Sequence, residues 1–274
     1  MYSRFIRTFE HGVTTILAIK IAVGFTVGAL MGMTGLGGGI LLLPLLIVVL
    51  RVPAMIAIGS GTAFAAITKT GAAVTYWNRR EVDWPLVAYL ASGSVPAGLL
   101  GTVLLGYLRS SYGESINKIL SVVIGILLLV IASLMMWRSP IERSGKTAMR
   151  SRLPEWITPR MGAVVTGIVG GFLVGATSMG AGSVIMILLL LFYNRSPRVL
   201  VGTDIFHGVI LTAATTMGHL RLHTIDWSLV AALLIGSLPG VYFGSKLSAV
   251  VPSIRLRQIL LIVLIGTGLV MAKG

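Results

Sequence analysis

Two glycine-rich clusters interrupt apolar stretches of the chain and carry hydroxyl side chains beside the glycines. A helix that begins at such a break directs its first N–H groups and the positive end of its dipole toward the break, which favours an anion. Glycine lets an oxyanion approach the backbone closely, and Ser and Thr add donors. The predicted oxyanion-binding residues are Thr34, Gly35, Gly37, Gly38 and Gly39 in the first cluster, and Thr177, Ser178, Gly180, Ala181, Gly182 and Ser183 in the second. The alternative is that these glycines only permit close helix packing.

Lys69 lies two-thirds along the apolar segment 54–77, between Thr68 and Thr70. An ammonium near the centre of a membrane helix costs about 2.5–3.5 kcal/mol, so it is expected to face a cavity or a partner. In a surrounding of low dielectric constant it would attract an anionic substrate strongly. The alternative is a structural ion pair, for which Asp204 is the candidate partner.

Asp204 and His207 are three residues apart, on one face of the segment 197–219. A buried Asp–His pair can carry a proton during transport. The alternative is a structural role, in which Asp204 pairs with Lys69 or caps the helix. His219, at the end of the segment, is expected at a wet interface. The pairs Asp83-Trp84 and Asp226-Trp227 are predicted to begin helices, because Asp favours a helix N-terminus and Trp favours the membrane interface.

The composition requires a membrane surrounding for these residues. Of 274 residues, 55% are hydrophobic and only 11% are charged, and the mean hydropathy is +0.95. A soluble domain has about 25% charged residues. The 22 basic residues outnumber the 8 acidic ones and lie between apolar segments, as expected for loops on the cytoplasmic side of a membrane rather than for a nucleic-acid-binding surface. The chain has no cysteine, which excludes disulfides and thiolate metal sites.

Apolar segments of spanning length, about 20 residues, alternate with shorter ones. The segments 54–77, 84–108, 117–137, 197–219 and 227–248 meet this length, and 256–272 is at its lower edge. The runs 37–50 and 182–193 are too short, and each follows a glycine-rich cluster. The stretch 138–160 is basic and polar, and it contains three prolines. We interpret it as a linker between two membrane units, residues 12–137 and 161–273.

The two units are predicted to be homologous repeats. When the chain is shifted by 143 residues, roughly 20 of about 74 positions between 28 and 101 are identical. The identities include Asp83-Trp84 with Asp226-Trp227, and Gly93-Ser94 with Gly236-Ser237. Two positions that lie 143 residues apart are called corresponding positions below.

The orientation of the repeats depends on how the first glycine-rich break is counted. If 14–34 and 37–50 form a re-entrant hairpin, each unit has three crossings and the repeats are inverted. If they form one broken crossing, each unit has four and the repeats are parallel. We favour inverted repeats because 161–178 is short for a full span.

The glycine-rich motifs resemble those of the TauE/SafE family. The resemblance rests on Gly28-x3-Gly32-x-Thr34-Gly35-Leu36-Gly37-Gly38-Gly39, on its weaker copy at 171–182, and on Gly236-Ser237-Leu238-Pro239-Gly240. It implies a permease of the bacterial or archaeal cytoplasmic membrane for small sulfur-containing oxyanions or organosulfonates, with sulfite export the best-known activity. The functional residues of the family correspond here to the two glycine-rich clusters. The second cluster departs from the pattern at Ala181 and Ser183.

The sequence therefore predicts an all-α polytopic membrane protein that acts as a secondary transporter of a small anion. We expect the substrate at the bilayer midplane, between the two glycine-rich helix breaks. No constellation predicts an enzyme, a cofactor or a metal site. Two alternatives remain, namely a passive anion channel and a membrane subunit or enzyme that transports nothing. Saturable counterflow argues against a channel, and transport by the purified protein alone argues against a subunit.

Overall fold

Helices make up all the regular structure of the described residues in the computed structural model. The structure describes residues 2–34, 39–143, 159–179, 185–186, 188–189, 193, 195–247 and 253–273. Its elements are α1 (Tyr2–Thr34), α2 (Gly39–Pro44), the π-helix η1 (Leu45–Val49), α3 (Ala54–Asn78), α4 (Trp84–Tyr112), the 3-10 turn η2 (Gly113–Ser115), α5 (Ile116–Arg143), α6 (Pro159–Thr177), α8 (Pro197–Arg221), α9 (Trp227–Leu247) and α10 (Ser253–Ala272). The prediction of an all-α protein is confirmed.

The lengths of these helices suit a membrane. Within the described residues, five segments are long and apolar enough to cross a bilayer, and one of them, 84–133, contains α4 together with most of α5. The 25-residue α3 is also long enough to cross but is not one of the five, and it carries Lys69. Large apolar side chains on the outside of the bundle, such as Leu100, Val103 and Leu238, are exposed. These faces fit contact with lipid rather than with water.

Two helices extend well beyond the predicted apolar segments. Helix α1 already begins at Tyr2, before the first apolar segment, and α5 continues to Arg143, into the stretch that the sequence analysis assigned to the linker. The next described helix, α6, begins at Pro159, a residue type suited to the first turn of a helix. The part of the linker from 144 to 158 lies outside the described residues.

Two pairs of helices, α1 with α9 and α4 with α6, make the most extensive contacts in the described part of the bundle. Gly28 of α1 lies against the backbone of Ser237 in α9, and Gly171 of α6 lies against the backbone of Ser94 in α4. A Cβ atom on either glycine would overlap a backbone oxygen. The same contact recurs one turn away on both sides, at Gly24, Gly32, Gly167 and Gly175. Both pairs run parallel, and their contacts are made by residues at corresponding positions.

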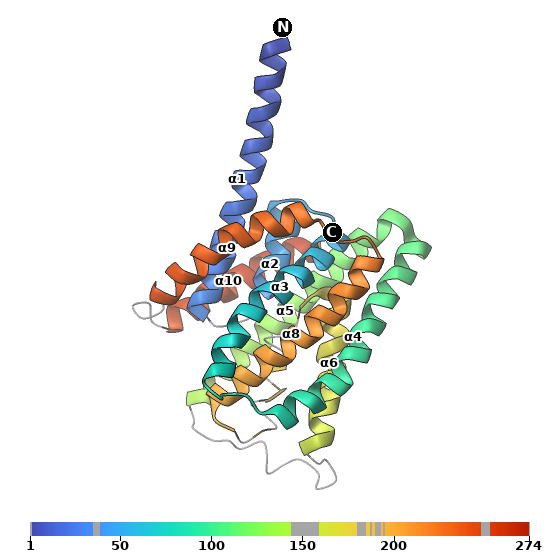
Figure 1. Ribbon diagram of the computed structural model, residues 1–274. Helices are drawn as coiled ribbons and strands as arrows, with labels where there is room; N and C mark the ends of the chain where they lie inside the picture. Colours follow the sequence, from blue (N-terminus) through green and yellow to red (C-terminus); the bar gives the residue numbers. More distant parts are fainter. Residues whose placement is uncertain are drawn as a thin grey trace.

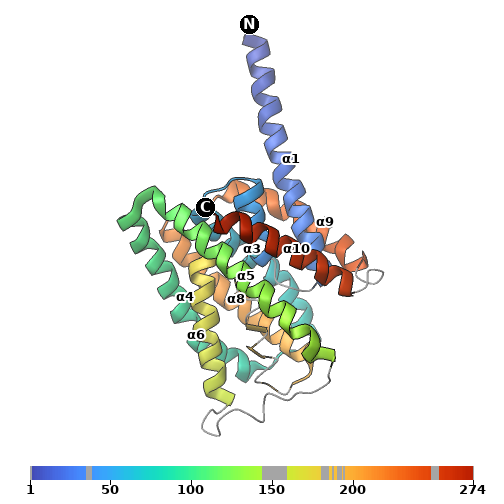
Figure 2. The same cartoon turned by 180° about the vertical axis from the view of Figure 1, so that it is seen from behind.

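Helices α3 and α8 lie side by side through the middle of the bundle and run in opposite directions (Figure 1). Gly59 near the start of α3 lies against Thr224, just after the end of α8. Gly202 near the start of α8 lies against Glu81, just after the end of α3. These two contacts again join corresponding positions. Figure 2 shows α5 and α10 on the other side of the bundle, where Gly125 and Gly268 face each other.

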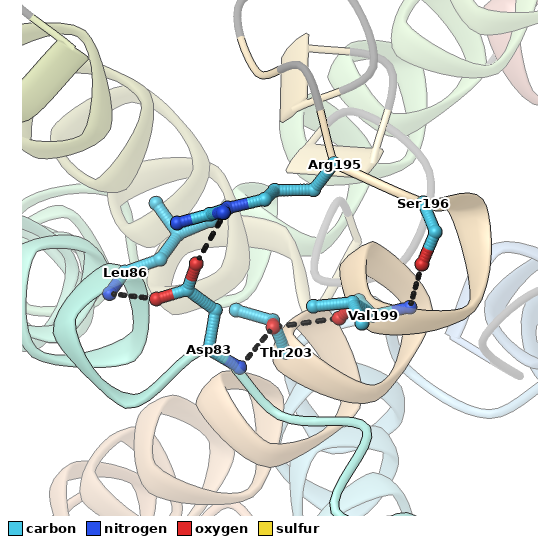
Figure 3. A network of polar contacts seen from close by, with 6 residues as sticks. All are labelled: Asp83, Leu86, Arg195, Ser196, Val199 and Thr203. Carbon is cyan, nitrogen blue, oxygen red and sulfur yellow. Dashed lines mark hydrogen bonds and ion pairs between the residues drawn. The ribbon is translucent and has the colours of Figure 1, made fainter.

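The Asp-Trp pairs begin α4 and α9, as predicted. The Asp83 carboxylate accepts a hydrogen bond from the Leu86 N–H at 3.3 Å, and the Asp226 carboxylate accepts one from the Leu229 N–H at 3.0 Å. Each side chain thus satisfies a backbone donor of the first helical turn. Arg195 adds an ion pair to Asp83 at 3.0 Å (Figure 3).

Each of these corners is also joined to the central helices by a hydroxyl group. The N–H of Asp83 donates to Thr203 Oγ1 of α8 at 2.9 Å (Figure 3), and the N–H of Asp226 donates to Ser60 Oγ of α3 at 3.0 Å. Ser60 and Thr203 occupy corresponding positions, as do Asp83 and Asp226. The two helices that begin at the Asp-Trp pairs are therefore fixed to the central pair in the same way.

The close helix approach makes a prediction for Gly171→Ala. The added methyl group would overlap the Ser94 backbone and push α6 away from α4, at a cost of about 1–3 kcal/mol, so we expect a lower melting temperature. Heating the detergent-purified protein and measuring the surviving monodisperse fraction by size-exclusion chromatography checks this. The matched control is Gly266→Ala, since nothing lies within 4 Å of the added atom there. Equal melting temperatures for the two variants would contradict the packing account.

Candidate functional site

Lys69 lies in the interior of the protein, on the face of α3 that packs against α8. Its residue is only 8% exposed. The side chain extends across α8, and its Nζ atom contacts Gly208 so closely that a Cβ atom at that position would overlap it. The absence of a side chain at Gly208 therefore makes the room in which the ammonium lies. Lys69 is thus buried inside the protein, as a lysine that faces a cavity or a partner would be.

Asp204 and His207 lie on α8 beside this ammonium. Asp204 is one helical turn before Gly208, and it is 5% exposed. The Lys69 ammonium interacts electrostatically with the Asp204 carboxylate. Asp204 Oδ1 has no hydrogen-bond partner among the described residues. The structure therefore brings together two of the charged groups that the sequence analysis selected, although they belong to different halves of the chain.

His207 is fully buried and joins α8 to α4. Its Nε2 atom lies 2.7 Å from the hydroxyl of Ser94, and its Nδ1 atom has no partner within the part of the chain that the structure describes. Ser94 belongs to the repeated Gly-Ser-x-Pro signature, and it also lies against Gly171 of α6. His207 is next to Gly208, which contacts Lys69. It thus links this part of α8 to the tightly packed pair formed by α4 and α6.

His219 is not at a wet interface, and that expectation was wrong. The residue is 0% exposed, and its Nδ1 atom lies 3.0 Å from the hydroxyl of Thr224. The last turn of α8 is covered because the chain turns back after His223 and places Thr224 over it. Arg221 and His223 at the same end are exposed.

The described residues reach the edges of both glycine-rich clusters. Helix α1 ends at Thr34 and α2 begins at Gly39, whereas the predicted residues 35–38 lie outside the described residues. Helix α6 ends at Thr177, whose hydroxyl donates to the Leu173 carbonyl at 2.7 Å. Residues 180–184, which include the predicted Gly180, Ala181, Gly182 and Ser183, also lie outside. The predicted breaks at 35–38 and 180–184 themselves therefore stay predictions.

Ser178 is a described residue of the second cluster that carries a buried hydroxyl group. It follows the end of α6, has a φ of 55°, and is 5% exposed. Its hydroxyl has no hydrogen-bond partner among the described residues. A Cβ atom at Gly61 of α3 would lie 3.1 Å from this hydroxyl. Ser178 therefore lies against the same face of α3 as Lys69, two helical turns away, which is about 12 Å along the axis.

Two residues of this site were missed by sequence reasoning. Gly208 gives no signal in the sequence, because a glycine within an apolar helix is common in membrane proteins. Ser94 did have a signal, since it belongs to the repeated Gly-Ser-x-Pro signature, but its pairing with His207 depends on how α4 packs against α8. The contact of Lys69 with Gly208 likewise depends on the antiparallel arrangement of α3 and α8.

Basic side chains line two cavities at the end of the bundle where α3 ends and α8 begins. One, of about 470 Å³, is lined by Tyr76, Arg79, Glu81, Arg198 and Val201. The other, of about 690 Å³, is lined by residues that include Arg80, Asp83, Trp84 and Arg195. Four arginines and two carboxylates at this end make it electropositive, which favours the approach of an anion.

Comparison with known proteins identifies the family. A family model described as "Sulfite exporter TauE/SafE" matches residues 20–271. The chain is 36% identical over 228 residues to the "Probable membrane transporter protein YjnA" of Bacillus subtilis, covering 83% of this chain and 89% of that protein. It is 22% identical over 238 residues to the "Probable membrane transporter protein YdhB" of the same organism, covering 87% and 93%. No solved structure matches the chain.

The family match extends over nearly all the described helices, and the similarity to YjnA covers most of both chains. The residues that the family model matches include both glycine-rich clusters, Lys69 and the Asp204–His207 pair. The resemblance seen in the sequence motifs is thereby confirmed. This chain is a multi-pass membrane protein that belongs to the TauE/SafE family.

Proposed function

We propose that this protein is a secondary transporter of a small sulfur-containing oxyanion, such as sulfite or an organosulfonate, and that Lys69 binds the anion between α3 and α8. The observation that carries the proposal is the buried Lys69 ammonium against Gly208. An ammonium held inside a membrane helix bundle attracts an anion far more strongly than one in water. The choice of a sulfur oxyanion follows the name of the family.

We propose that the two glycine-rich clusters form a second part of the same pathway. Ser178 supports this, because its hydroxyl is buried, has no partner among the described residues, and faces α3. At about 12 Å from the level of Lys69, it is too far away to contact the same small anion simultaneously. The predicted residues of the clusters would then bind the anion at one position and Lys69 at another. The basic cavities beside Arg79 and Arg198 would raise the local anion concentration.

We propose further that residues 12–137 and 161–273 are inverted repeats joined by the linker. The contacts that recur at corresponding positions support this, and so does the antiparallel arrangement of α3 and α8, which are themselves corresponding helices. Inverted repeats place equivalent surfaces on opposite sides of the membrane, an arrangement suited to alternating access. The Lys69 site would lie where the repeats meet.

Counterflow of labelled sulfite into proteoliposomes tests the transport proposal. The wild type should show saturable uptake, and Lys69→Gln should raise the half-saturating concentration about 10- to 100-fold, because a hydrogen bond to a charged group contributes about 1.5–3 kcal/mol. Lys118→Gln, which neutralises an exposed lysine at the start of α5, is the matched control and should transport as the wild type does.

Three other outcomes would decide against parts of this proposal. Unsaturable flux with single-channel currents would indicate a channel. No flux from the purified wild type would remove the assignment of sulfite. Loss of the folded protein in both Lys69→Gln and Asp204→Asn would favour a structural ion pair over substrate binding.

The contact between Lys69 and Gly208 makes a second prediction. In Gly208→Ala the charge is kept, but the new methyl group occupies the place of the Nζ atom and displaces it. We expect weaker sulfite affinity in the counterflow assay, with the folded protein retained. Gly71→Ala is the matched control, because it lies on the same helix as Lys69 and nothing lies within 4 Å of the added atom. Unchanged affinity in Gly208→Ala would show that the position of the ammonium does not matter.

The inverted arrangement predicts the sidedness of two corresponding loops. Arg80 and His223 occupy corresponding positions, and both have a positive φ, 56° and 52°. Because the natural chain has no cysteine, Arg80→Cys and His223→Cys each introduce a single thiol. A membrane-impermeant maleimide should label one variant in intact cells and the other only in inverted vesicles. Labelling of both from the same side would show parallel repeats, and labelling after permeabilisation controls for reactivity.

A further inference from the structure

We propose that Asp204 is the residue that couples anion binding to protonation, so that one proton crosses the membrane with each anion. In the empty carrier, Lys69 and Asp204 would neutralise each other. When an anion binds Lys69, the Asp204 carboxylate would take up a proton. This inference rests on the proposed function and adds to it the ion that drives transport.

The geometry places the two charges where one responds to the other. Lys69 Nζ lies on Gly208, and Asp204 is four residues earlier on the same face of α8. The two groups attract each other. One oxygen of the Asp204 carboxylate has no hydrogen-bond partner among the described residues, so it is available to a proton. Both residues are buried, at 8% and 5% exposure.

The other titratable groups of α8 and α3 do not replace Asp204 in this role. His207 is held by Ser94 through Nε2, and a second positive charge beside the Lys69 ammonium is electrostatically unfavourable. His219 is about four turns beyond Asp204 along α8 and pairs with Thr224. On α3, Tyr76 packs against Gly202.

The helices α4 and α6, which also pack against α8, carry their charges at their ends. On α4 the charged residue is Arg109, in the last turn, and Asp83 caps the first turn. On α6 it is Arg160, at the start of the helix. The backbone of Glu81, after the end of α3, contacts Gly202. Within the described residues, Asp204 is thus the carboxylate one helical turn from the glycine that Lys69 contacts.

Charge balance supplies the reason for the coupling. A site that contains one ammonium and one carboxylate is neutral, and a bound monovalent anion would give it a net charge of −1. An uncompensated charge inside a membrane protein is costly, and protonation of the carboxylate removes it. The loaded site and the empty site are then both neutral. Anion and proton would leave together, and a monovalent anion would move without net charge.

The test counts protons in proteoliposomes that contain wild type or Asp204→Asn. Net sulfite uptake is measured together with the change of internal pH, at a membrane potential clamped to zero. Any proton carried by sulfite itself contributes equally to both proteins. We expect the wild type to move one proton more per sulfite than Asp204→Asn. Glu114→Gln, an exposed carboxylate outside the bundle core, is the matched control and should keep the wild-type ratio.

The outcomes separate this inference from the proposed function. Sulfite counterflow with the same proton ratio in wild type and Asp204→Asn would overturn the inference and leave the transport proposal standing. A loss of the proton in His207→Gln, with the wild-type ratio retained in Asp204→Asn, would assign the proton to the histidine instead. Absence of sulfite counterflow by the wild type would overturn the proposed function, and this inference with it.

Infrared difference spectroscopy keeps the inference testable if Asp204→Asn does not fold or transport. Adding sulfite to the purified wild type should produce a C=O band of a protonated carboxyl group. Asp204→Glu should shift this band, and Glu114→Gln should leave it unchanged. A wild-type spectrum without such a band would show that no carboxylate is protonated when the anion binds.

Discussion

The close backbone contact of parallel helices is the constraint on which the rest of this structure depends. Where α1 meets α9 and α4 meets α6, a carbonyl oxygen occupies the space that a Cβ atom would need. In a bilayer, helices gain little from burying apolar side chains against each other, because lipid is equally apolar, and close approach supplies van der Waals contact instead. These two pairs flank α3 and α8, the helices that carry the charged residues.

The polar interior follows from that arrangement. Ser94 lies in the tight contact of α4 with α6 and also holds His207 on α8, so the packing of the outer pair sets the orientation of a side chain in the centre. Lys69 needs the missing side chain at Gly208 in order to lie against α8. Glycines therefore serve two purposes in this protein. Some let helices approach closely, and Gly208 makes room for a charged group.

The sequence was sufficient to predict the helical fold, the starts of α4 and α9 and the burial of Lys69, because each has a local cause. Asp83 and Asp226 cap helices through their own side chains, and Lys69 stands out because a charge in an apolar segment is costly. Which residues meet in space depends on helix packing, which no single segment encodes. The contact of Lys69 with Gly208, the pairing of Ser94 with His207 and the burial of His219 all arise between separate helices or after a turn, so they could not be predicted.

The unequal distribution of charged residues between corresponding positions has a consequence for engineering the chain. Lys69 corresponds to Thr212, Asp204 to Gly61, and His207 to Phe64. Two copies of the first part would place a lysine at both positions 69 and 212 and no carboxylate at position 204. Two copies of the second part would place an aspartate at both positions 61 and 204 and no lysine at position 69. Neither arrangement would reproduce the combination of Lys69 with Asp204, to which each part of this chain contributes a different residue.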